Sequence, residues 1–234
     1  SKLTNAEARF EWYFAPEQRL SMAGFWKKID SPIEAFTGFS DNAPQTSYAN
    51  APEATLYGAE FEAQKYIDTS GLGGWFSDRR LVTIANYTFT KSKIKVGAGD
   101  TVRIFGTNEQ AATNVFRDGA PLTGQSDHIA NLQFGFENTE RLSQQTVMIT
   151  YASKRVTSRG PAGLPDIIEN PGLRIDLVAR EEMNLSGIPI DLKFEVRNIT
   201  GRGRFEYQTT GTNRVEINSY DVGTSVSASA SIEF

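Results

Sequence analysis

The chain has 234 residues, with 28 Asp and Glu against 24 Lys and Arg, no cysteine, and a single histidine, His128. This mildly acidic balance offers no basic face for a phosphate backbone, so we expect no nucleic-acid partner. The lack of cysteine and of further histidines disfavours disulfides, zinc sites and nucleophilic triads, and we predict neither a metal nor a cofactor.

A membrane-crossing helix needs roughly 18 consecutive apolar residues, and no run in the chain approaches that length. Any crossing would therefore be made by strands. The first half of the chain alternates apolar and polar residues with the period of two that a strand requires. In the clearest case, Tyr57 and Phe61 alternate with Glu60 and Glu62. We predict strands here at residues 6–14, 19–29, 54–67 and 81–90.

The second half of the chain continues the same alternation. Leu192, Phe194 and Val196 alternate with Lys193 and Glu195, which gives one apolar and one charged side. We predict strands here at residues 130–137, 146–151, 173–180, 192–197 and 226–234. The whole chain is then expected to contain about nine strands of roughly ten residues, a length that suits membrane-spanning strands.

The connections between the predicted strands alternate in length. Short turns follow residues 14, 67, 137 and 182, and long polar loops are predicted at residues 30–53, 91–127, 157–171 and 200–223. A soluble β-sandwich would show the same period of two, but it has no need to gather its long loops at one end. Outer-membrane barrels have short turns on one side and long loops on the other. This rhythm favours an all-β, antiparallel transmembrane β-barrel.

The barrel interpretation predicts which side chains meet lipid and which meet a wet interior. The residues expected on the lipid side near mid-bilayer are Leu132, Phe134, Leu177, Phe194 and Val196. Their neighbours Gln133, Asp176 and Glu195 are expected to face the lumen. A slip of one residue would exchange the two sides completely, so the prediction is a strict one.

The end of the chain carries the motif Ser-Tyr-Asp-Val-Gly-Thr at residues 219–224, followed by an alternating strand that ends in an aromatic residue. This segment resembles the closing segment of TonB-dependent outer-membrane receptors. The stretches at residues 57–62, 85–90, 121–131 and 196–200 resemble the same family in order and spacing. The resemblance implies a signal for the barrel assembly machinery, made of Val226, Ala228, Ala230, Ile232 and Phe234.

The resemblance implies a barrel of about 22 strands, of which residues 1–234 would be the C-terminal portion. A plug domain and a segment that contacts TonB would lie outside this chain. An odd number of strands does not close a bacterial barrel of this kind, so the remaining strands are expected in another piece of the same receptor, either cleaved from this one or not included. The implied function is active transport of a bulky nutrient across the outer membrane, of the siderophore, cobalamin or oligosaccharide class.

Two alternatives stay open at this point: a passive outer-membrane porin, and a soluble all-β binding module. An enzyme is not expected, because Glu60 and Glu62 lie on one side of a strand that is directed at the lumen. Ligand contacts are expected in the long loops, from the aromatic and basic residues Phe36, Phe39, Tyr48, Arg117, Arg155 and Arg159. The loop at residues 91–127, which contains Phe105 and Phe116, is expected to act as a mobile polar lid.

Overall fold

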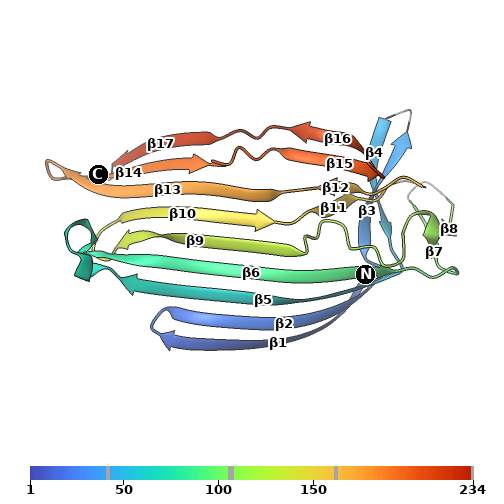
Figure 1. Cartoon of the computed structure of the whole chain (residues 1–234), viewed down its shortest axis with the longest axis horizontal. Coiled ribbons are helices and arrows are strands. Elements are labelled where there is room, and N and C mark those ends of the chain that lie inside the picture. The colour runs from blue at the N-terminus through green and yellow to red at the C-terminus, as the bar shows by residue number, and fades with distance from the viewer. Residues whose placement is uncertain (41–42, 105–107, 161–162, 233–234) are drawn as a thin grey trace.

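The computed structural model describes residues 1–40, 43–104, 108–160 and 163–232, and it shows a large antiparallel sheet (Figure 1). The nine strands of this sheet follow one another in chain order, each paired with its neighbour. They are β1 (Lys2–Ala15), β2 (Gln18–Asp30), β5 (Glu53–Asp68), β6 (Arg79–Lys95), β9 (His128–Asn138), β10 (Ser143–Ala152), β13 (Gly172–Leu185), β14 (Ile188–Arg197) and β17 (Ser225–Ile232). The predicted set of nine strands is confirmed, with most strands longer than expected.

The connections lie at opposite ends of the sheet according to their length (Figure 1). At the short-turn end, β13 and β14 are joined by Ser186 and Gly187, which both have positive φ angles, as a two-residue hairpin turn requires. The β5 to β6 turn contains two short 3-10 helices, η1 (Ser70–Leu72) and η2 (Gly74–Phe76). All the long connections lie at the other end, which confirms the predicted rhythm.

The long connections are more regular than the sequence indicated. Four strands in them, β11 (Arg155–Ser158), β12 (Ile167–Glu169), β15 (Arg204–Thr210) and β16 (Asn213–Tyr220), form a second sheet in the order β11-β12-β15-β16. This order repeats that of β10, β13, β14 and β17, which these strands prolong beyond the large sheet (Figure 1). The prediction of a polar loop at residues 200–223 is therefore wrong, because most of that segment forms the paired strands β15 and β16. In residues 157–171, paired strands occupy only residues 157–158 and 167–169.

The two earlier long connections also contain paired strands. β3 (Ile33–Ser40) and β4 (Ala43–Asn50) form a hairpin, and β3 lies beside β11, where the Thr37 N–H donates to the Arg159 carbonyl at 2.9 Å. The next connection contains the short pair β7 (Thr101–Val102) and β8 (Gln110–Ala111), followed by the 3-10 helix η3 (Ala112–Asn114). The order of strands at the long-connection end, beyond the large sheet, is therefore β4, β3, β11, β12, β15 and β16.

The register gives the large sheet an apolar face and a polar face. One row across the strands pairs Phe10, Met22, Phe61, Tyr87, Ala130, Tyr151 and Leu173 in turn. The next row pairs Glu11, Ser21, Glu62, Asn86, Asn131, Thr150 and Arg174. Because side chains alternate along a strand, these rows mark opposite faces.

The hydrophobic core lies at the long-connection end and not beneath the large sheet. Its buried residues are Phe36, Ala49, Ala51, Ala54, Ile94, Val96, Val102, Ala112, Phe116 and Leu122. The core joins the β3–β4 hairpin and the connection after β6 to the ends of β5 and β6. Phe116 is only 1% exposed. The connection expected to be a mobile polar lid therefore has a packed apolar base, while Phe105 lies outside the described residues.

Candidate functional site

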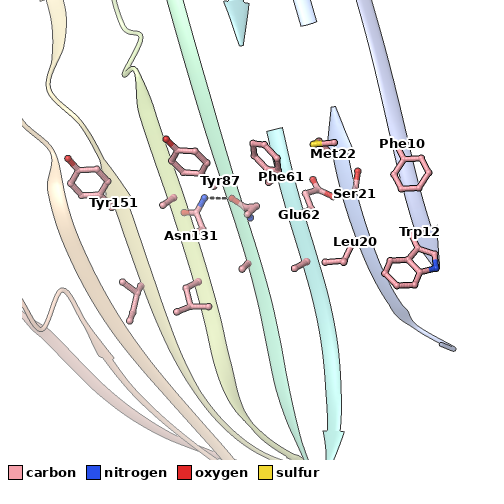
Figure 2. Close-up of a pocket in the computed structure, with 16 residues that line it drawn as sticks. Phe10, Trp12, Leu20, Ser21, Met22, Phe61, Glu62, Tyr87, Asn131 and Tyr151 are labelled. Atoms are coloured by element: carbon pink, nitrogen blue, oxygen red, sulfur yellow. Dashed lines mark hydrogen bonds between the residues drawn. The ribbon is translucent and has the colours of Figure 1, made fainter. Parts of the chain in front are cut away.

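The apolar face of the large sheet is open. Aromatic side chains such as Phe10, Trp12, Phe61 and Tyr151 are exposed there, and with Tyr87 they border a shallow hollow of 610 Å³ (Figure 2). A soluble monomer rarely exposes an apolar surface that crosses so many strands. Contact with lipid would avoid the free-energy cost of exposing this apolar face to water.

The predicted division of the two faces agrees with the register. Phe134 pairs with Val147, which pairs with Leu177, and Leu177 pairs with Val196, so these residues share the apolar face. Leu132 and Phe194 belong to the same face by alternation. Gln133, Asp176 and Glu195 lie on the polar face, as expected. Their contact with lipid or lumen itself stays a prediction.

The polar face carries ion pairs between neighbouring strands. Arg19 contacts Glu62 at 3.2 Å, Arg80 contacts Glu137 at 2.6 Å, and Arg180 contacts Asp191 at 2.6 Å. Placing such charges in hydrocarbon costs free energy, whereas water beside the sheet would solvate them. The polar face is therefore suited to line an aqueous interior.

At the long-connection end, Arg159 is buried among carboxylates, and its side chain is 1% exposed. Its Nη2 donates to Glu34 at 2.7 Å, and its Nη1 donates to Asp166 at 2.9 Å. The Glu34 carboxylate also accepts the Thr123 N–H at 3.1 Å. Burial raises the pKa of the Glu34 carboxyl, and the positive charge of Arg159 opposes that rise. These bonds tie three long connections to one guanidinium.

Two residues expected to contact ligand are not exposed. The guanidinium of Arg159 is occupied by the hydrogen bonds just described, and Phe36 is a core residue that is only 8% exposed. Both side chains pack where the β3–β4 hairpin meets β11. A ligand contact by either residue stays a prediction. Phe39 lies in the same hairpin, opposite Pro44 in the register.

The other expected ligand residues lie nearer the surface. Tyr48 is 64% exposed on β4. Arg117 contacts Asp166 at 2.6 Å while its side chain stays mostly exposed, and the Nη2 of Arg155 contacts Glu169 at 2.8 Å. Whether any of these residues contacts a ligand stays a prediction.

Tyr48 lies at a hollow that the sequence did not indicate. The hollow has a volume of 370 Å³, and its lining includes Thr37, Tyr48, Ser158, Arg204, Glu206 and Ile217. Arg204 and Glu206 contact each other at 3.0 Å. The alternation of charged Arg204 and Glu206 with Phe205 and Tyr207 was the signal that could have predicted this strand.

The hollow at Tyr48 continues the polar side of the molecule. Val156 and Ile168 line a different hollow together with Tyr57 and Lys93, which belong to the apolar face. Ile168 pairs with Tyr207, and Glu169 pairs with Glu206. Because side chains alternate along a strand, Glu206 points to the side opposite Ile168, which is the side of the hollow at Tyr48. We refer to this polar hollow as the mouth hollow.

The last strand shows where the predicted assembly signal lies. Val226, Ala228, Ala230 and Ile232 pair with Val196, Phe194, Leu192 and Ile190, respectively, and share the apolar face with them. The small residues Ala228 and Ala230 thus lie opposite larger ones. Phe234 is outside the described residues, and the role of the segment as an assembly signal stays a prediction.

Comparison with protein families decides the identity of the fold. The family described as TonB dependent receptor-like, beta-barrel, matches residues 1–199. The chain belongs to this family. The TonB-dependent receptors are outer-membrane active transporters and not enzymes, so the barrel interpretation, the outer-membrane location and the transport class are confirmed. The short-turn end is then periplasmic and the long-connection end extracellular.

The match ends before residues 200–234, so the resemblance of the closing motif rests on its own residues. Comparisons with curated proteins and with solved structures gave no match. Within the described part of the chain, no helix has the length and apolarity needed to cross a membrane. The same residues contain no group of three or more His, Asp or Glu side chains arranged to hold a metal ion.

Proposed function

We propose that this chain forms the C-terminal part of the barrel wall and extracellular mouth of a receptor that imports a bulky polar nutrient. The mouth hollow carries the proposal. It lies on the side that continues the polar face, and it places the exposed ring of Tyr48 beside the buried hydroxyl groups of Thr37 and Ser158, which hydrogen-bond each other at 2.8 Å. Few but well-placed polar groups beside an aromatic ring are typical of ligand sites.

The lining of the mouth hollow supports one nutrient class above the others. Arg204 and Glu206 neutralise each other across 3.0 Å, so the lining offers no net charge to an anionic ferric siderophore. An exposed aromatic ring in a neutral polar lining suits an oligosaccharide, which presents hydroxyl groups and apolar ring faces. We therefore place oligosaccharides first among the three classes, ahead of siderophores and cobalamins.

The two outer strands support a larger barrel. In the described residues, β1 pairs only with β2, and β17 pairs only with β14. Exposed edges of this length template further pairing, and a closed barrel removes them. We propose that both edges pair with the remaining strands of the same receptor, and that the polar face surrounds its plug. TonB would act on the part of the receptor that carries the plug.

The test uses the full-length receptor in cells and after purification. Binding of an oligosaccharide panel, a ferric siderophore and cobalamin is measured by isothermal titration calorimetry for the native receptor and for Tyr48→Ala. A matched control is Tyr13→Ala, which removes an exposed tyrosine at the other end of the sheet. We expect binding of an oligosaccharide that Tyr48→Ala weakens about tenfold, a loss of about 1.4 kcal/mol, because the exposed ring is removed. Tyr13→Ala should leave this binding unchanged.

Uptake is then followed with and without an agent that dissipates the proton-motive force. Active transport predicts that uptake stops while binding persists. Binding of a siderophore or cobalamin alone would contradict the choice of oligosaccharides. Equal binding by native receptor and Tyr48→Ala would contradict the role of the mouth hollow.

A further inference from the structure

A second hollow lies on the apolar side of the molecule, at the extracellular end. It has a volume of 630 Å³, and its lining includes Tyr57, Lys91, Lys93, His128, Lys154 and Arg155. We call it the basic hollow. Nutrient uptake through the lumen makes no use of it, because Tyr57, Lys91 and Lys93 point away from the lumen.

The charges in the basic hollow are only partly neutralised. Lys91 forms an ion pair with Asp127, and Arg155 forms one with Glu169. Lys93 and Lys154 are exposed, and within the described ranges neither has a carboxylate within ion-pair distance. Two ammonium groups are thus free to bind an anion.

Gln125 provides an independent observation. Both atoms of its side-chain amide are buried, and neither has a hydrogen-bond partner in the described part of the protein. Gln125 also lines the basic hollow. A buried amide normally has partners, so an orphan pair of donor and acceptor at the wall of a cavity indicates a polar ligand.

The register shows where the basic hollow lies relative to the membrane interface. Phe61, Tyr87 and Tyr151 lie in one cross-strand row on the apolar face. Tyr57 and Lys91 pair four residues closer to the extracellular end, roughly 13 Å farther along the strands. In outer-membrane barrels, girdles of aromatic residues mark the membrane interface. The lysines therefore lie at or just above the level of lipid headgroups.

The ring of His128 connects the aromatic row to the basic hollow. The Tyr87 hydroxyl and the His128 Nδ1 are 2.7 Å apart, and the two rings stack with centroids 6.1 Å apart. The Ser153 N–H donates to the His128 carbonyl at 2.9 Å. The floor of the hollow is therefore continuous with the membrane-facing wall.

We propose that the basic hollow binds the phosphorylated headgroup of an outer-leaflet lipid. Lys93 and Lys154 would contact phosphate oxygens, and the Gln125 amide would hydrogen-bond the headgroup. The acyl chains would lie along the apolar face below. Clusters of basic residues beside the membrane surface bind anionic lipids, and the contribution of each lysine corresponds to about fivefold in affinity.

The experiment titrates lipid A, a phosphorylated glycolipid, into the full-length receptor in a neutral detergent and counts bound lipid by native mass spectrometry. The variant Lys93→Gln/Lys154→Gln is compared with Lys65→Gln/Lys95→Gln, which removes the same charge from positions outside the hollow. We expect about a 25-fold loss of lipid A affinity for the first variant, as two fivefold factors, and little change for the second.

Gln125→Leu separates direct contact from general charge. It removes the orphan amide without changing charge, so lipid A affinity should fall while the thermal unfolding midpoint in lipid-free detergent does not fall. Parallel titrations use phosphatidylcholine and inorganic phosphate. Unchanged lipid A affinity in Lys93→Gln/Lys154→Gln would overturn the proposal. So would an equal loss of phosphatidylcholine affinity, or displacement of lipid A by millimolar phosphate, which would assign the hollow to a soluble anion.

Discussion

Arg159 and Glu34 are 125 residues apart in the sequence, and they meet in a buried pair with an Nη2 to Oε2 distance of 2.7 Å. The pair joins the β3–β4 hairpin to the connection that follows β10, and through Thr123 it holds the connection that follows β6. The extracellular connections therefore behave as one folded unit and not as independent loops.

Arg159→Met tests this unit. The change leaves the Glu34 carboxylate buried without its cationic partner, while Asp166 keeps its contact with Arg117. Removing one member of a buried pair typically costs about 3 to 5 kcal/mol. We expect amide exchange in residues 31–52 and 117–123 to rise strongly in the full-length receptor. Arg117→Met is the control, because Arg117 contacts the same Asp166 from an exposed position, where an ion pair contributes roughly 0 to 1 kcal/mol. Equal protection in both variants would show that Arg159 does not organise the connections.

Gly58→Ala tests the close approach of β5 and β6. A Cβ atom at Gly58 would lie 2.1 Å from the Phe89 carbonyl oxygen, which belongs to the backbone and cannot turn away. Overpacking of this kind costs about 1 to 3 kcal/mol, so the barrel should unfold at a lower urea concentration. Gly24→Ala on neighbouring β2 is the control, because nothing lies within 4 Å of its Cβ position. The prediction fails if both variants unfold at the same midpoint.

Phe134→Arg tests the membrane face. Phe134 lies on the apolar face, where an arginine near the bilayer midplane costs about 2 to 4 kcal/mol. Gln133→Arg places the same charge on the polar face of the same strand and should cost much less. The measurement is equilibrium unfolding of the full-length receptor in phospholipid vesicles. A larger loss for Gln133→Arg would reverse the assignment of the two faces.

Acid should loosen the sheet formed by β11, β12, β15 and β16. Burial works against ionisation of Glu206, but hydrogen bonds from Arg204 and Asn218 outweigh it and lower the pKa of the carboxyl below its usual range. The ionised carboxyl therefore stabilises the folded sheet above the ordinary glutamate pKa of 4.5, and this stabilisation is lost as the pH falls through the lowered pKa. Amide exchange of residues 204–220, corrected for the intrinsic rate at each pH, should rise in that window. In Glu206→Gln the rise should be absent.

The nine membrane strands could be predicted because each has one apolar and one polar side over a long run. The same signal was present in Arg204 to Tyr207, but the glycines at positions 201 and 203 and the length of the segment between strands suggested a loop. The prolonged strands follow from pairing between two connections, β12 with β15, which no local pattern reports.

The core and the mouth hollow were harder to predict for a physical reason. Phe36, Ile94 and Phe116 belong to three separate segments and meet only after the connections fold together. Loops rich in aromatic and basic residues therefore suggested an exposed ligand surface. In the structure, Phe36 packs in the core and Arg159 bonds the carboxylates of two connections. Arg204 and Glu206 were passed over because their segment was expected to lack regular structure.

The second sheet repeats the strand order of the four membrane strands beneath it, and this limits where the extracellular surface can change during evolution. An inserted residue within β12 or β15 would shift the ladder that joins two connections, and one within β11 or β16 would shift the neighbouring ladder of the same sheet. The β15–β16 tip at Gly211 and Thr212 has no such constraint, since a turn absorbs added length. Changes in length on the extracellular surface are therefore expected mainly at hairpin tips, and the same tips are the natural places to insert an epitope tag.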